Sequence, residues 1–479
     1  MNRKAIACSS SREDLRQELV SMKPSTVLLV SDLRLKREKL SIVHPEKIQE
    51  RRSMFLSNFD QKFVHYVQKY VHFFSAPSQI PFDLIIGVHM EALSRLMVAY
   101  DFICGRLTFN SEEKRFEIDC NDEGVPLAIC SSELCLQELG DITIPNPAFS
   151  QLCLTSESSN RTLEDEPLLS LQITRFKCGG YTLGTSVNHG VMDGFGLQGF
   201  ARNFTCMAVK GELASVPVID RSCLQARTPL QIKYEHEEYL DPSKSSPHLI
   251  LSSIATQRNK EMWHTKMAFN NVSETHIFKS FMLSGKMLET LKTKAADDGV
   301  KQCTSFMVAL AHLWRTRTIS IGNMNAHDVS TVHYAVETRS RFVPPLPWEF
   351  AGNGSVSAYA KATGKELQEE PFGEIVKKLQ EGSDRLTDEY LRSSIDWLEL
   401  HDGVQGLENG FLASNWKHFR FGEVELRGGI KSLHGGPVVS GWEKVVLFLA
   451  HPQDHQGMQL YIGLEASHMD IFEKLIETV

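Results

Sequence analysis

The chain has 479 residues, of which 42% are hydrophobic and 23% charged, so we expect roughly two or three globular domains whose cores need neither a metal nor a disulfide. The formal net charge of −8, with no basic tail or Lys/Arg-rich face, argues against a nucleic-acid partner. The apolar runs are strand-sized and the N-terminus lacks the apolar run of a secretory signal, so we expect no membrane span, a cytoplasmic location and ten reduced cysteines.

The first half of the chain mixes strands and helices. Apolar runs and apolar–polar alternation predict short strands at residues 27–30, 70–74, 115–119 and 168–174. A helical period predicts a helix over residues 82–100, and a second helix follows Gly194 and ends at Gly211. No dinucleotide-binding or phosphate-loop fingerprint accompanies these elements.

The most informative segment lies just before that second helix. Residues 181–188 alternate as a strand that stops at His189, and Asp193 opens the next element. An imidazole at the end of a rigid strand can be aimed into a cleft, and histidine takes and returns a proton near neutral pH. Local sequence leaves alternatives open, because His189 also fits a polar turn and Asp193 a helix N-cap.

The second half repeats the same mixture after a segment, residues 220–265, whose prolines and serines suit a linker. Strands are predicted at residues 278–283, 332–337, 445–449 and 459–464, and helices at 286–296, 304–317, 371–400 and from 470. We therefore expect two α/β domains of similar build, facing one another across a cleft.

Several stretches, in order over nearly the whole chain, resemble the plant BAHD acyl-CoA-dependent acyltransferases. They are Phe55–Asp60, Ala99–Leu107, Cys178–Gly184, Asn188–Gly194, Asp220–Arg221, Ala226–Arg227, Cys303–Phe306, Trp314–Arg315, Arg339–Pro347, Gly352–Asn353 and Asp388–Asp396. The resemblance implies two chloramphenicol-acetyltransferase-like α/β domains with a channel between them. These domains would span residues 1–225 and 266–479, and residues 226–265 would form the crossover linker.

The resemblance also implies a mechanism. His189 would act as general base and remove the proton of an alcohol or amine while it attacks the thioester carbonyl, without a metal or an acyl-enzyme. Asp193 would point away from the substrate and pair with Arg339, which fixes the turn and thereby the imidazole. Acyl-CoA would be a co-substrate, and no cofactor would be bound permanently.

Further residues are assigned to the substrates through the same resemblance. CoA is expected against the second domain, near Thr304, Ser305, Ser414, Asn415 and Trp416. Trp397 is a candidate wall of the acceptor channel, although a core position fits it equally well. The partners would be acyl-CoA and a small alcohol or amine acceptor, and the protein would be a monomer.

One stretch departs from the family pattern. The family's second signature, Asp-Phe-Gly-Trp-Gly, is replaced here by Glu425–Gly429, in which Arg427 and Gly428 stand for the first glycine and the tryptophan. The chain is therefore either an active enzyme with a repacked loop or a non-catalytic accessory protein of very-long-chain fatty-acid elongation. The intact His189 and Asp193 favour the enzyme.

The substrate class is inferred from the branch that the chain resembles. That branch moves hydroxycinnamoyl groups onto ω-hydroxy fatty acids and fatty alcohols, and it includes polyamine acyltransferases. A polyamine would need carboxylates near the channel, which Glu399, Asp402 and Glu408 could supply, although they also fit an exposed loop. An uncharged channel wall would instead suit a fatty acceptor.

Overall fold

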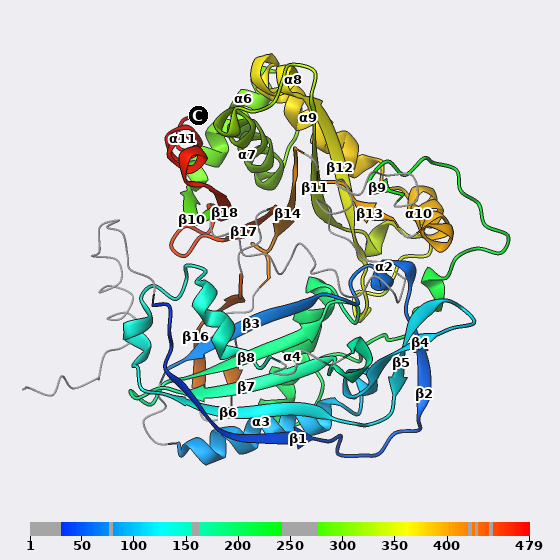
Figure 1. The fold of residues 1–479 in the computed structure, drawn as a ribbon, viewed down its shortest axis with the longest axis vertical. Coiled ribbons are helices and arrows are strands. Elements are labelled where there is room, and N and C mark those ends of the chain that lie inside the picture. The colour runs from blue at the N-terminus through cyan, green and yellow to red at the C-terminus, as the bar shows by residue number, and fades with distance from the viewer. Residues whose placement is uncertain are drawn as a thin grey trace, which may run out of the picture.

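The computed structural model describes residues 30–75, 80–155, 162–241, 276–401, 403–407, 409–419, 424–426, 430–439 and 444–479. The predicted strand at 27–30 lies almost wholly outside the described residues. Elsewhere the chain forms two sheet-containing α/β domains. The first is drawn in the lower part of Figure 1 and the second in the upper part.

The first domain is built on a seven-stranded sheet. In spatial order its strands are β1 (Leu35–Val43), β6 (Val125–Ser132), β7 (Leu169–Arg175), β8 (Tyr181–Asn188), β3 (Val67–Phe74), β16 (Ile430–Pro437) and β15 (Glu425–Leu426). Helices α3 (Phe82–Leu96) and α4 (Gly194–Lys210) pack together beside it. A smaller sheet of β2 (Arg52–Phe55), β5 (Arg115–Cys120) and β4 (Arg106–Asn110) lies at one end (Figure 1).

The second domain is built on a six-stranded sheet. Its spatial order is β10 (His276–Leu283), β18 (Met458–Glu465), β17 (Val445–Ala450), β14 (Phe411–Asn415), β11 (Val329–Glu337) and β12 (Ser355–Thr363). The helices of this half are α6 (Gly285–Asp297), α7 (Ser305–Ile321), α8 (Gly364–Glu369), α9 (Phe372–Asp384), α10 (Asp388–Leu400) and α11 (Ala466–Ile476). A two-stranded pair, β9 (Tyr239–Leu240) and β13 (Val404–Gln405), lies near α10 (Figure 1).

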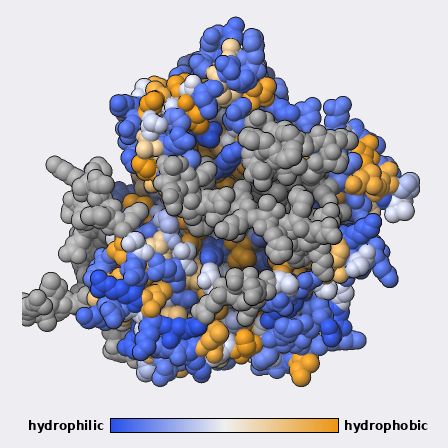
Figure 2. All heavy atoms as spheres, viewed as in Figure 1, coloured by the Kyte–Doolittle hydropathy of each residue, from blue (hydrophilic) through white to orange (hydrophobic). Residues whose placement is uncertain are grey.

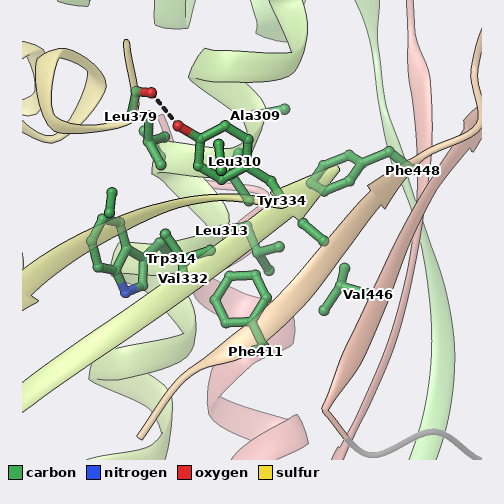
Figure 3. Close-up of a cluster of buried hydrophobic side chains, with 14 of the residues drawn as sticks. Ala309, Leu310, Leu313, Trp314, Val332, Tyr334, Leu379, Phe411, Val446 and Phe448 are labelled. Atoms are coloured by element: carbon green, nitrogen blue, oxygen red, sulfur yellow. Dashed lines mark hydrogen bonds between the residues drawn. The ribbon is translucent and has the colours of Figure 1, made fainter. Parts of the chain in front are cut away.

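Helix α7 forms the centre of the second core. Its start is fixed by the Thr304 hydroxyl, which accepts a hydrogen bond from the Met307 amide, and its end by Gly322 in the left-handed conformation. Figure 3 shows its apolar side chains facing strands β11, β14 and β17. The fully buried Trp314 donates its indole hydrogen to the Ser330 hydroxyl at 2.9 Å, so its polar atom is satisfied within the core.

Sequence patterns did not predict that strand β16 would join the sheet of the first domain. It comes from the second half of the chain but pairs antiparallel with β3, so the first sheet is completed by residues of both halves. The proposed domain limits of 1–225 and 266–479 stay a prediction, and much of the predicted linker, from residue 242 onward, lies outside the described residues.

The face seen in Figure 2 is predominantly hydrophilic, with its hydrophobic side chains in separate small groups. Large apolar side chains that are well exposed, such as Ile48, Val216 and Trp348, lie in connecting segments that are far apart in the sequence. Within the described part of the chain, the helices are too short or too polar to cross a membrane.

Candidate active site

A cavity of about 180 Å³ lies where the two domains meet, and His189 is part of its wall. The wall residues from the first half include Lys62, Phe63, Tyr66, Lys69, Tyr70, His189, Asp193, Phe195 and Tyr239. Those from the second half include Glu337, Ser355, Ser357, Gln405, Leu412, Ser414, Asn415, Trp416, Phe419, Val438 and Leu447. The residue singled out from sequence therefore faces an internal space that both domains build.

His189 is held at the end of β8 by contacts to its backbone and its ring. Its amide donates to the Tyr66 carbonyl at 2.7 Å, and its imidazole stacks on the Phe63 ring with centroids 4.2 Å apart. The Nδ1 atom is buried and has no hydrogen-bond partner in another of the described residues. The ring lines the cavity, so we infer that Nε2 is the nitrogen that faces it.

Burial lowers the pKa of His189 below its ordinary value, although its own backbone carbonyl and the charge of Asp193 act in the opposite direction. The imidazole is therefore neutral at neutral pH. A neutral imidazole with one nitrogen facing a cavity can accept a proton from a bound hydroxyl or amine.

Asp193 forms the predicted ion pair with Arg339, and it caps helix α4 as well. Its two carboxylate oxygens accept from the Arg339 guanidinium at 2.9 and 3.0 Å, which is bidentate pairing. They also accept from the amides of Gly196 and Gly354 and from the Ser355 hydroxyl. These five hydrogen bonds hold the carboxylate away from the ring of His189 and fix the turn between β8 and α4.

The charge of this carboxylate is secured by its surroundings. Burial would raise the pKa of Asp193, but the Arg339 charge and the hydrogen bonds outweigh it and leave the pKa below its ordinary value. Burial likewise opposes the charge of Arg339, and Asp193 outweighs it and raises the Arg339 pKa. The pair is thus ionised on both sides although it is almost completely buried.

A second buried network, to which sequence reasoning assigned no role, holds the other side of the histidine turn. Asp60 pairs with Arg221 at 3.2 Å and accepts from the Asn353 amide groups at 2.8 and 3.0 Å. Asn353 in turn donates to the His189 carbonyl at 2.9 Å, and Arg221 donates to the Val191 carbonyl at 2.6 Å. All three side chains fall in stretches that carried the family resemblance, but only the fold brings them together.

The residues expected near CoA divide into two groups. Ser414, Asn415 and Trp416 line the cavity, and the Trp416 indole donates to the Ser414 hydroxyl at 2.8 Å. Thr304 and Ser305 belong to the start of α7 and are not among the described residues of the cavity wall. Their expected contact with CoA stays a prediction.

Trp397 lies one layer behind the wall. It is buried in α10 and stacks on Tyr239, whose ring centroid is 5.5 Å away and which itself lines the cavity. Tyr239 takes the wall position of the described cavity, and the role of Trp397 at an acceptor channel stays a prediction.

The described wall carries two lysines, Lys62 and Lys69, and its acids are engaged elsewhere. Asp193 and Glu337 both interact with Arg339. Glu399 accepts from the Asn58 amide outside the cavity wall, and Asp402 and Glu408 lie outside the described residues. The acidic ring that a polyamine acceptor would need is not found among the described wall residues. Within the same part of the chain, no cluster of three or more His, Cys, Asp or Glu side chains is placed to hold a metal ion.

Comparison with known proteins gives a consistent result. A family model described as "Transferase family" matches residues 34–479. The chain is 36% identical over 466 residues to "Acyltransferase GLAUCE" of Arabidopsis thaliana, covering 95% of this chain and 98% of that one. It is 29% identical to "Omega-hydroxypalmitate O-feruloyl transferase" of the same plant, covering 92% of each.

Solved structures share the fold at low sequence identity. Vinorine synthase superposes with a TM-score of 0.69 at 17% identity, over 91% of this chain and 96% of that one. TRI101 of F. graminearum, complexed with coenzyme A and T-2 mycotoxin, superposes with a TM-score of 0.68 at 14% identity, over 88% and 96%. The likeness covers about nine tenths of this chain and shows that the two-domain fold is shared.

Proposed function

Because the chain belongs to the BAHD acyltransferase family, we propose that it transfers an acyl group from a CoA thioester to an alcohol or amine, with His189 as the general base. The observation that carries the proposal is the position of the His189 imidazole on the wall of a cavity between the domains, where burial lowers its pKa. Two buried networks, through Asp193 and through Asn353, fix the turn that presents it.

The reaction follows from the position of the ring. The Nε2 atom of His189 removes the acceptor proton while the oxygen or nitrogen attacks the thioester carbonyl. The tetrahedral oxyanion then collapses, the carbon–sulfur bond breaks, and the imidazolium returns the proton to the departing thiolate. The oxygens of Asp193 are engaged by protein donors, so its role is to hold the backbone of the turn.

The donor and its location are part of the proposal. We place the CoA arm along Ser414, Asn415 and Trp416, on the second-domain wall of the cavity. A hydroxycinnamoyl donor is supported by relatives named for feruloyl and hydroxycinnamoyl transfer, such as "Shikimate O-hydroxycinnamoyltransferase" of Nicotiana tabacum, 28% identical over 454 residues. We further propose that the protein acts as a monomer in the cytoplasm.

An enzyme is expected to have a through-channel in which His189 is exposed, and a non-catalytic partner protein a plugged one. The cavity beside His189 supports the enzyme, and its continuation as a through-channel stays a prediction. The altered loop contributes little to the choice, since Arg427–Gly429 lie outside the described residues and Leu426 is buried in the first core.

The direct test is thiol release by the purified protein. Hydroxycinnamoyl-CoA and fatty acyl-CoA donors are each combined with fatty-alcohol, shikimate, phenolic and polyamine acceptors, and His189→Ala is the matched blank. We expect release that depends on the acceptor and is lost in the variant. A folded wild-type protein that releases no thiol with any pair would overturn the proposal.

A further inference from the structure

Lys62 is a cation on the cavity wall that has no anionic partner among the described residues. It follows the short helix α2 (Asn58–Gln61), directly before Phe63, which stacks on His189. Its Nζ atom is buried and makes no hydrogen bond within the described part of the chain, and it lies 3.5 Å from the centre of the Tyr239 ring. The attraction between a cation and an aromatic face makes up for only part of the hydration free energy that the buried cation loses.

The nearest acid is already engaged. Glu238 attracts the ammonium electrostatically but forms no ion pair with it. One carboxylate oxygen of Glu238 is 2.9 Å from the His236 ring nitrogen, and the other accepts from the Tyr390 hydroxyl at 2.6 Å. Burial lowers the pKa of Lys62 to about 7, and Glu238 offsets this only partly. Among the described residues Lys62 therefore has no paired acid, and its amine is only partly protonated at neutral pH until an anion binds.

Two other buried cations near the site, unlike Lys62, have carboxylate partners. Arg339 is paired with Asp193, and Arg221 is paired with Asp60, in each case within hydrogen-bond or ion-pair distance. An unpaired ammonium is costly in the same surroundings, so an anion bound in the cavity would stabilise the charged form of Lys62.

We propose that Lys62 binds a carboxylate of the acceptor, so that the acceptor is a hydroxy acid or an amino acid. This rests on the proposed function. The acyl part of a hydroxycinnamoyl-CoA cannot supply the anion, because its carboxyl carbon is the thioester carbonyl. The CoA phosphates are the other source of negative charge, but we place the CoA arm on Trp416 and its neighbours, whereas Lys62 lies against Tyr239.

Of the acceptor classes considered from the sequence, the inference favours hydroxy acids over plain fatty alcohols and polyamines. A polyamine would bring further positive charge to a wall that already has Lys62 and Lys69. A plain alcohol would leave the Lys62 ammonium without a partner. A carboxylate forms a charge-assisted hydrogen bond with it, and that bond is strong in a site shielded from water.

The test compares acceptors that differ only in that charge. Shikimate is paired with methyl shikimate, and ω-hydroxypalmitate with its methyl ester, for wild-type protein, Lys62→Met and Lys69→Met. We expect wild type to prefer at least one acid over its ester by about tenfold or more in kcat/KM. Lys62→Met should remove that preference and keep its activity on the ester. Lys69→Met is the matched control and should keep the preference.

The design separates the possible failures. Methionine in place of an unpaired buried ammonium is expected to leave the fold stable, so loss of the preference is not explained by unfolding. An active wild type without any preference for acids overturns the inference but not the function. So does a Lys62→Met variant whose only defect is a raised KM for acyl-CoA, because the phosphates would then be the partner.

If wild type releases no thiol with any pair, the proposed function fails and binding decides the inference. Shikimate and methyl shikimate are then titrated calorimetrically into wild type and Lys62→Met. Binding of shikimate that weakens about tenfold in the variant, with no change for the ester, supports the carboxylate site. Equal binding by both proteins, or no binding of the acid, overturns it.

Discussion

At the scale of single residues, the turn that presents His189 is fixed from two sides by buried charges. Asp193 with Arg339 holds the end of the turn that leads into α4, and Asp60 with Arg221 and Asn353 holds the end that leaves β8. The cost of burying these charges is met by hydrogen bonds to nearly every carboxylate oxygen. The imidazole is thereby positioned without any direct contact to the charges that position it.

Removing one partner of such a pair should be expensive. In Asp193→Ala the buried Arg339 loses its bidentate partner, so we expect the free energy of unfolding to fall by about 3–5 kcal/mol. Because the turn loses its anchor, kcat should fall while KM for acyl-CoA changes little. Urea unfolding and steady-state kinetics measure both quantities. The exposed Asp384→Ala is the control, with an expected change within about 0.5 kcal/mol. Equal stability of Asp193→Ala and wild type would contradict the role given to the pair.

The lowered pKa of His189 has a consequence for the pH profile. General-base catalysis needs the neutral imidazole, and a pKa below the ordinary value of about 6.5 keeps the ring neutral to lower pH. The acid limb of kcat/KM should therefore be centred below about pH 6.5. The assay uses a neutral acceptor, such as an ester or a fatty alcohol, so that ionisation of the acceptor does not affect the pH profile. An acid limb centred above that value would show that burial does not govern this histidine.

At the scale of elements, the sequence predicted most of the parts but not all of their limits. Strand alternation located β8 and its end at His189, and the helix after Gly194 is confirmed with its stop at Gly211. The helix predicted over residues 82–100 ends at Leu96. After it the amides of Val98 and Ala99 bond to carbonyls three residues back, as in a turn, and a 3-10 helix begins at Asp101. Local patterns report local periodicity, so the pairing of β16 with β3 could not be read from them.

Strand β8 also contains a position where only glycine fits. A Cβ atom at Gly184 would lie 1.8 Å from the Leu152 carbonyl oxygen, and backbone cannot move aside as a flexible side chain can. We expect Gly184→Ala to destabilise the protein by about 1–3 kcal/mol or more and to lower activity, because β8 carries His189. Thermal unfolding and thiol release measure the two effects.

Gly199 in helix α4 is the matched control for that substitution. A Cβ atom there meets nothing within 4 Å, and alanine is favoured over glycine inside a helix by about 0.5–1 kcal/mol. Gly199→Ala should therefore stabilise the protein slightly. If both variants unfolded at the temperature of wild type, the close approach between β8 and Leu152 would be ruled out as a constraint.

At the scale of the whole molecule, the site exists only when the two domains are docked. Asp193 and Asp60 come from the first half of the chain, and their partners Arg339 and Asn353 come from the second. Strand β16 adds a backbone connection by completing the first sheet. The family resemblance predicted the Asp193–Arg339 pair across this boundary. It did not predict the Asp60 network or the unpaired Lys62, because burial and pairing are properties of the assembled fold.

The measurement that tests the central claim most directly is made on His189→Gln with the best donor and acceptor. The assay follows both acceptor-dependent thiol release and the affinity for acyl-CoA. We predict that kcat/KM falls by about 10²–10⁴-fold while acyl-CoA binds as tightly as to wild type, since a general base contributes on that scale and the cavity is otherwise intact. A folded variant that keeps its activity within about tenfold of wild type would contradict His189 as the base.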